Sequence, residues 1–137
     1  PRLRVSALCH ALMPEQHSED RFRDSRPHPC DPNPAEAGAL KYVTCCIRKM
    51  LTDLRRLQVD SKEVVATLIG GANVLEGLNG RWSVADRNVA VAIATLEKHH
   101  IPIRYMDVGG TRGRTIEHLS DLNRTTVRYH RSNPQTL

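Results

Sequence analysis

The chain has 137 residues, a length that suits one domain with a sizeable core. Its net charge of +5 points to acidic partners, but the basic residues are dispersed and aromatic residues make up only 4%, too few for stacking on nucleic acid. Composition therefore argues against nucleic-acid binding, and no apolar run approaches the roughly 20 residues that a membrane helix needs.

The start of the chain and its cysteines bear on the cellular compartment. No basic-then-apolar block marks a secretory signal, and Pro1 replaces the usual methionine, so we expect the chain to begin inside a longer open reading frame. The cysteines, at positions 9, 30, 45 and 46, are a poor disulfide framework because two are adjacent on a predicted helix. A reducing cytoplasm is the simpler interpretation.

Residues 4–12 alternate in a pattern that predicts a β-strand, ended by Pro14. His10 lies among apolar neighbours on this strand, on a face expected to be half-buried. Such a histidine, taken alone, is typical of a core or rim position. Cys9 is next to it, but neighbouring side chains on a strand point to opposite faces, so the two do not form a catalytic pair.

The segment 15–33 is polar, rich in charge and long for a compact domain, and we interpret it as an inserted surface loop. His28 and Cys30 lie in it without a second Cys/His pair at ligand spacing. No metal site is predicted there.

Two amphipathic helices follow. Asn33 and Pro34 form a helix-start signal, and apolar residues at spacings of three and four extend the predicted helix to about Arg56. Residues 63–69 form an apolar, valine-rich run that predicts a buried strand. Ser83, with an acidic residue three positions later, starts a second helix that ends near the histidine pair 99–100.

The last third of the chain predicts strands. Residues 101–108 form one, and residues 114–119 and 124–130 alternate like the two arms of a hairpin, with a frayed tail from residue 131. Helices and strands that alternate in this order predict an α/β fold.

Two glycine-rich turns end the strands at 63–69 and 101–108. They contain Gly70 and Gly71 in the first, and Gly109 and Gly110 in the second. Glycine permits positive φ and a close approach of another group, so each is either a tight turn or part of a functional edge of the sheet.

These motifs, in this order and spacing, resemble the CheD family of chemoreceptor glutamine deamidases over nearly the whole chain outside the loop 15–33. The motifs are Cys9-His10-Ala11-Leu12-Met13-Pro14, Leu40-Lys41-Tyr42-Val43, Ile69-Gly70-Gly71-Ala72-Asn73-Val74, Asp86-Arg87-Asn88-Val89, Ile101-Pro102-Ile103 and Asp107-Val108-Gly109-Gly110-Thr111-Arg112-Gly113-Arg114.

The resemblance implies one CheD-like domain over residues 1–137, with a layered α/β/β cysteine-hydrolase-like fold: two helices on a mixed sheet, and N-terminal strands missing. It implies a Cys-His-Thr hydrolase that converts glutamine to glutamate on methyl-accepting chemotaxis receptors, in the cytoplasm and without a cofactor. His10 takes the place of the catalytic histidine. Gly70, Gly71, Gly109 and Gly110 are expected at the rim of the substrate site.

The sequence departs from the family pattern at the nucleophile. The family's cysteine and orienting threonine lie upstream of the histidine, and none of the nine residues before His10 matches them. Either the chain lacks an upstream segment or the protein has lost its nucleophile, and the chain as given is expected to be inactive. The alternative function is a non-catalytic binding partner of a CheC-type phosphatase of CheY.

Overall fold

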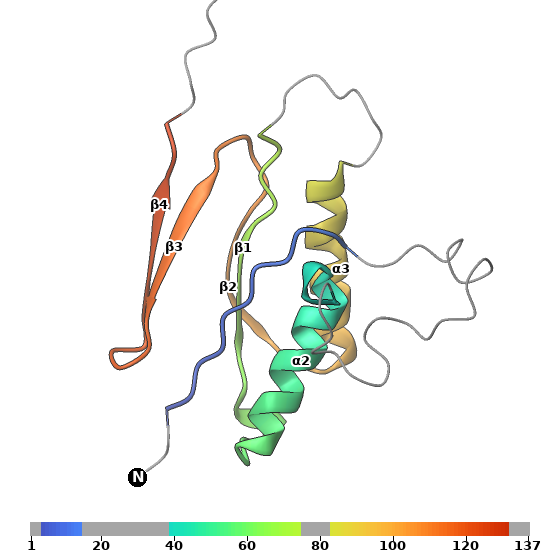
Figure 1. Cartoon of the computed structure of the whole chain (residues 1–137), viewed down its shortest axis with the longest axis vertical. Coiled ribbons are helices and arrows are strands. Elements are labelled where there is room, and N and C mark those ends of the chain that lie inside the picture. Colours follow the sequence, from blue (N-terminus) through green and yellow to red (C-terminus); the bar gives the residue numbers. More distant parts are fainter. Residues whose placement is uncertain (1–3, 15–38, 75–82, 132–137) are drawn as a thin grey trace, which may run out of the picture.

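The computed structural model describes residues 4–14, 39–74 and 83–131 of the chain (Figure 1). The predicted loop 15–33, the predicted helix start at Asn33 and Pro34, and the tail from residue 132 fall outside the described residues. All structural statements below refer to the described ranges.

The order of elements is that of an α/β fold, as predicted. Short 3-10 turns cover Ala39–Lys41 and Ser61–Glu63. The helices and strands are α2 (Val43–Arg56), β1 (Ala66–Gly70), α3 (Val84–Lys98), β2 (Ile103–Val108), β3 (Arg114–Leu119) and β4 (Arg124–Tyr129).

The strands form one parallel and one antiparallel pair. β1 and β2 run parallel with α3 between them in sequence, a β-α-β crossover, and Gly70 is paired with Val108 where both strands end. β3 and β4 pair antiparallel from Arg114 opposite Tyr129 to Leu119 opposite Arg124, which confirms the predicted hairpin. Figure 1 shows α2 and α3 on one side of the β1–β2 pair and the hairpin on the other.

The core lies between the two helices and the parallel strands. Its buried members are Val43, Ile47, Ala92, Leu96 and Ile101. They come from α2, α3 and the residue after the α3 turn, so the apolar stripe of each helix meets the other across the helix pair. Partly buried Leu68 and Ile103 of the parallel strands close this cluster from the sheet side.

The second helix begins as predicted. Ser83 Oγ accepts a hydrogen bond from the Asp86 backbone N–H at 3.1 Å and donates one to Asp86 Oδ2 at 2.9 Å. One side chain thereby satisfies an N–H that the helix leaves unpaired. α3 ends at Lys98, and His100 after it has a φ of 58°, the left-handed conformation in which many helices terminate.

The helix predicted from Asn33 to Arg56 is interrupted at residues 39–42, and its predicted start lies outside the described residues. α2 begins at Val43, with Tyr42 in the capping position and a 3-10 turn before it, although its end at Arg56 agrees with the prediction. The Val43 N–H donates to the Met13 carbonyl at 2.8 Å, so a tertiary contact with the N-terminal segment satisfies the first turn. The pattern of apolar spacing does not report this contact.

The predicted strand at residues 4–12 is also wrong. This segment forms no ladder with any described strand, and a single β-bridge, between Met13 and Tyr42, lies just after it. A strand requires a neighbour for its backbone groups, and alternation of side chains predicts strand formation only where such a neighbour exists. The N-terminal segment is therefore an extended chain that crosses in front of the parallel strands (Figure 1).

Candidate functional site

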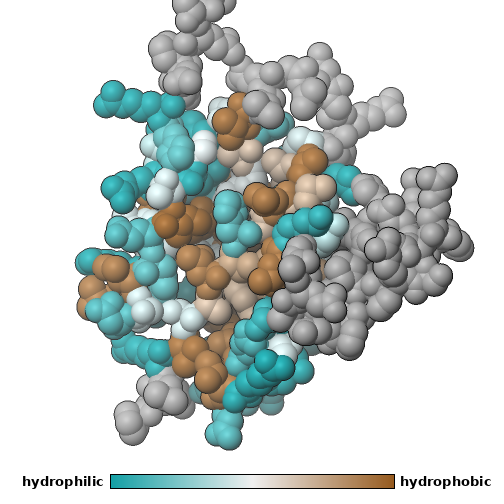
Figure 2. Space-filling model, in the orientation of Figure 1, coloured by the Kyte–Doolittle hydropathy of each residue, from teal (hydrophilic) through white to brown (hydrophobic). Residues whose placement is uncertain are grey.

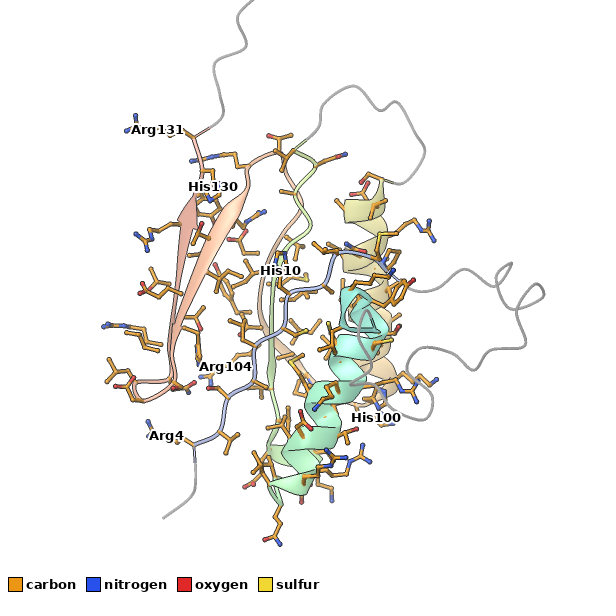
Figure 3. The ribbon with its side chains drawn as sticks, in the orientation of Figure 1. Arg4, His10, His100, Arg104, His130 and Arg131 are labelled. Carbon is orange, nitrogen blue, oxygen red and sulfur yellow. The ribbon has the colours of Figure 1, made fainter. Side chains whose placement is uncertain are left out.

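His10 lies on the N-terminal segment with its side chain exposed to solvent (Figure 3). The expectation of a half-buried histidine is wrong, because the segment is not covered by a neighbouring strand. Within the described part of the chain, no hydrogen bond or ion pair involves the His10 imidazole. An exposed imidazole without partners is accessible to a bound substrate.

Backbone hydrogen bonds fix the segment immediately after His10. The Leu12 and Met13 N–H groups both donate to the Lys41 carbonyl, at 2.9 and 2.8 Å, and the Met13 carbonyl accepts from Val43. Ala11 packs against the hydrophobic core. The residues after His10 are therefore held against the start of α2.

Two side chains from distant parts of the sequence hold the segment on either side of His10. Asn88 of α3 donates from Nδ2 to the Leu12 carbonyl at 3.1 Å. His118 of β3 lies with Nε2 2.9 Å from Ser6 Oγ, and with Nδ1 2.9 Å from Thr125 Oγ1. Sequence patterns gave no role to Asn88 or His118, because the contacts of these residues with Leu12 and Ser6 join positions more than 70 residues apart.

The described cysteines do not supply a nucleophile to His10. The Cys46 thiol is buried and donates to the Leu40 carbonyl at 2.9 Å, and burial raises its pKa to about 12. Cys9 interacts with Cys46 through its side chain and so is directed at α2. This agrees with the prediction that the side chains of Cys9 and His10 diverge.

Cys45 corrects the prediction about disulfides. It is disulfide-bonded, whereas Cys9 and Cys46 are free thiols. The adjacent cysteines do not pair with each other, as expected from their place on one helix, since the Cys46 thiol is free. A disulfide-bonded sulfur is not a nucleophile.

The two glycine turns meet at one edge of the parallel strands. The Gly109 N–H donates to the Gly70 carbonyl at 2.9 Å, and the Asn73 N–H donates to the Gly110 carbonyl at 2.8 Å. Gly70, Gly71, Gly109 and Gly110 have φ values of 120°, 64°, 77° and 71°. The predicted need for positive φ is confirmed, and the turns form a single edge at the carboxyl ends of β1 and β2.

The four glycines differ in what surrounds them. A Cβ at Gly71 would overlap the Val89 side chain and lie 3.2 Å from the Ala85 carbonyl, so this glycine lets β1 approach α3. A Cβ at Gly70, Gly109 or Gly110 would meet nothing within 4 Å. Gly71 thus has a packing role, while the other three leave open space at the turn. No hydrogen bond among the described residues joins these turns to His10.

A charged cluster fixes the second turn to the hairpin. Arg114 donates to Asp107 Oδ1 and to the Gly109 carbonyl, both at 2.9 Å, and its side chain is only 9% exposed. The Tyr129 hydroxyl donates to Asp107 Oδ2. These hydrogen bonds, first from Tyr129 and then from Arg114, lower the pKa of Asp107 below that of an ordinary carboxyl group.

In the part of the chain that the structure describes, no three or more histidine, cysteine or acidic side chains are grouped so that they could hold a metal ion, and none of the helices could span a membrane. A hollow of about 190 Å³ lies at the C-terminal ends of the two long helices, lined by residues that include Leu51, Arg55 and His99. Neither His10 nor a glycine of the turns lines it.

Comparison with known proteins identifies relatives for most of the chain. A family model described as CheD chemotactic sensory transduction matches residues 27–129. The chain is 30% identical over 113 residues to a probable chemoreceptor glutamine deamidase CheD 2 of Geobacter sulfurreducens. It is 33% identical over 120 residues to a probable chemoreceptor glutamine deamidase CheD of Maridesulfovibrio salexigens, and 26% identical over 132 residues to one of Archaeoglobus fulgidus.

These matches cover most of the chain but less of the relatives. They include 82%, 85% and 96% of the chain for the Geobacter, Maridesulfovibrio and Archaeoglobus proteins respectively. In the same order they span 59%, 65% and 74% of the relative. The chain therefore corresponds to roughly two thirds of the curated proteins that it matches.

Proposed function

We propose that this chain, which belongs to the CheD family of chemotactic sensory transduction proteins, provides the histidine of a protein-glutamine deamidase. The proposed substrate is a glutamine side chain on a methyl-accepting chemotaxis receptor, and the product is glutamate. The observation that supports it most directly is His10: exposed, free of partners among the described residues, and held on both sides by contacts with α2, α3 and β3.

The chemistry requires a nucleophile that the described residues do not offer. In the proposed reaction a thiolate attacks the carboxamide carbon, and the C–N bond then breaks as His10 gives its proton to the departing ammonia. Water, deprotonated by His10, next cleaves the thioester to release glutamate and regenerate the thiol. Cys9 is directed at α2 and Cys46 is buried with a raised pKa, so we assign the nucleophilic cysteine and the orienting threonine to a segment upstream of Pro1.

The glycine turns are proposed to form the rim of the substrate site. Open space at Gly70, Gly109 and Gly110 supports this role, because a protein backbone approaches more closely where no Cβ projects. A receptor substrate implies a cytoplasmic protein, although the disulfide at Cys45 is atypical of that compartment.

The test is a deamidation assay on the full-length product of the gene, with the 137-residue chain as a control. Mass spectrometry of a receptor cytoplasmic fragment detects conversion of glutamine to glutamate. We expect conversion by the full-length protein alone, and a loss of about 10²-fold or more in His10→Asn. His100→Asn is the matched control, since His100 is also exposed and asparagine tolerates its φ of 58°. Full activity in His10→Asn would refute the role of His10.

A second candidate function is binding without catalysis, to a CheC-type phosphatase of CheY. It is favoured by the described cysteines, each of which is buried, disulfide-bonded or directed away from His10. Pull-down of such a phosphatase by the 137-residue chain, together with the absence of deamidation by the full-length protein, would support this function. Absence of binding at micromolar concentration would exclude it.

A further inference from the structure

The segment that carries His10 is held after this residue by the packing of Ala11 and by the backbone hydrogen bonds of Leu12 and Met13, but it does not belong to a sheet. It has no ladder partner among the described strands, and Leu8 and Leu12 are 67% and 62% exposed. Apolar side chains gather on the face of the molecule that the segment crosses (Figure 2). Neither a sheet nor deep burial therefore determines where His10 lies.

Two side-chain contacts, one before and one after His10, also determine its position. The Leu12 carbonyl, two residues after His10, accepts from Asn88 Nδ2 at 3.1 Å. The Ser6 hydroxyl, four residues before it, lies 2.9 Å from His118 Nε2. Asn88 belongs to α3 and His118 to β3, so the segment is joined to both layers that flank the parallel strands.

We propose that Asn88 and His118 are positioning residues, which hold the backbone around His10 so that its imidazole has one orientation towards the substrate. This inference rests on the proposed deamidase function. Asn88 binds a carbonyl whose own residue is already hydrogen-bonded through its N–H to Lys41, so the peptide groups around Leu12 cannot rotate freely. His118 is itself oriented by Thr125, which occupies its other ring nitrogen.

The surroundings of Asn88 allow its effect on the orientation of His10 to be distinguished from its effect on the stability of the protein. Its Oδ1 atom is buried and has no hydrogen-bond partner, while its Nδ2 makes the bond to Leu12. Replacement by alanine removes a favourable hydrogen bond and an unfavourable unpaired acceptor together, and these effects on stability offset each other. The loss of orientation of His10 has no such compensation. Asn88→Ala should therefore reduce catalysis much more than it reduces stability.

The experiment uses the full-length product of the gene, with Asn88→Ala, Asn88→Asp and Ser6→Ala as test variants. Asn88→Asp keeps the shape of the side chain but places an acceptor against the Leu12 carbonyl. Ser6→Ala removes the partner of His118 without altering the hairpin. Glu97→Ala on an exposed position of α3 and Ser120→Ala in the β3–β4 turn are matched controls.

We expect kcat for deamidation of a receptor fragment to fall about 10- to 100-fold in both Asn88 variants and about threefold in Ser6→Ala, with KM changed less than twofold. The melting temperature of Asn88→Ala should stay within about 3 °C of the wild-type value. The controls should retain wild-type kcat. An unchanged kcat in Asn88→Ala would overturn the proposal, as would a fall in kcat that only accompanies a large loss of melting temperature.

A second readout does not depend on activity. In the same proteins, NMR signals of the His10 ring and hydrogen exchange of the Met13 amide report the order of the segment. We expect the ring signals to shift or broaden and the amide to exchange faster in Asn88→Ala. If the wild-type protein converts no glutamine, the deamidase function fails while these signals still decide the positioning role: unchanged signals in Asn88→Ala would refute it.

Discussion

Alanine at position 71 tests the close approach of β1 to α3. Gly71 has a φ of 64°, and a Cβ there would overlap the Val89 side chain and lie 3.2 Å from the Ala85 carbonyl. The left-handed conformation costs a residue with a Cβ about 1–2 kcal/mol, and forcing an extra methyl into a packed contact costs about 1–3 kcal/mol more. The free energy of unfolding should therefore fall by about 2–5 kcal/mol.

This change is large enough to measure by thermal unfolding. At about 2.1 cal/mol/K per residue, 137 residues have an unfolding entropy of about 0.29 kcal/mol/K, so 1 kcal/mol corresponds to a shift of about 3.5 °C. We expect the melting temperature of Gly71→Ala, followed by circular dichroism, to fall by about 7–17 °C. The fall should persist in the presence of salt, since no charge is altered.

Two comparisons separate the clash from the backbone strain. Gly110 has a similar φ of 71°, but a Cβ there meets nothing within 4 Å, so Gly110→Ala should cost only the strain, about 1–2 kcal/mol. Combining Gly71→Ala with Val89→Ala removes the overlapping methyl groups and should be less destabilising than the sum of the single changes. Equal losses in Gly71→Ala and Gly110→Ala, or strict additivity in the double variant, would refute the reasoning.

Three further predictions concern other parts of the structure. Burial raises the pKa of Cys46 to about 12, so iodoacetamide at pH 8 should modify Cys9 in the folded protein but Cys46 only after unfolding. Peptide mapping would identify the modified cysteine, and rapid modification of both in the folded protein would contradict this prediction. The hydrogen bond from Tyr129, and then that from Arg114, lowers the pKa of Asp107 in the folded protein. The Asp107 carboxylate therefore stabilises the fold at pH values above about 3.9, the ordinary carboxyl pKa, and this stabilisation is lost as the pH falls through the lower pKa of the folded state. The melting temperature of Asp107→Asn should therefore fall below that of the wild type at pH 7 and approach it near pH 2.5, whereas a difference independent of pH would exclude titration of Asp107 as its cause. Ser83→Ala should lower stability by about 1 kcal/mol through loss of the α3 cap, measured by urea unfolding, and no change would show that the cap is dispensable.

Elements with strong local signals agree with the predictions. Ser83 caps α3, and the hairpin pairs Arg114–Leu119 with Arg124–Tyr129, because capping and strand alternation are decided by residues close in sequence. The predicted continuity of the first helix through residues 39–42 and the predicted strand at residues 4–12 are wrong for one reason. Each depends on a contact with a remote segment, which local periodicity does not encode.

At the candidate site, too, the sequence predicts the local features but not the contacts between remote segments. Motifs in the sequence identify His10 and the positive-φ glycines, and they predict the family to which the chain belongs. The exposure of His10, the direction of the Cys9 thiol towards Cys46, and the hydrogen bond of Asn88 to Leu12 are not predictable from those motifs.

The sequence by itself determines the α/β order of elements, the family, and the residue types that the glycine turns require, because these follow from local propensities and recurring motifs. The tertiary structure alone decides that the two glycine turns form one edge, through the Gly109–Gly70 hydrogen bond, and that α3 and β3 hold the segment on either side of His10. These contacts join residues far apart in the chain, and their geometry arises only when helices and strands pack around a common core.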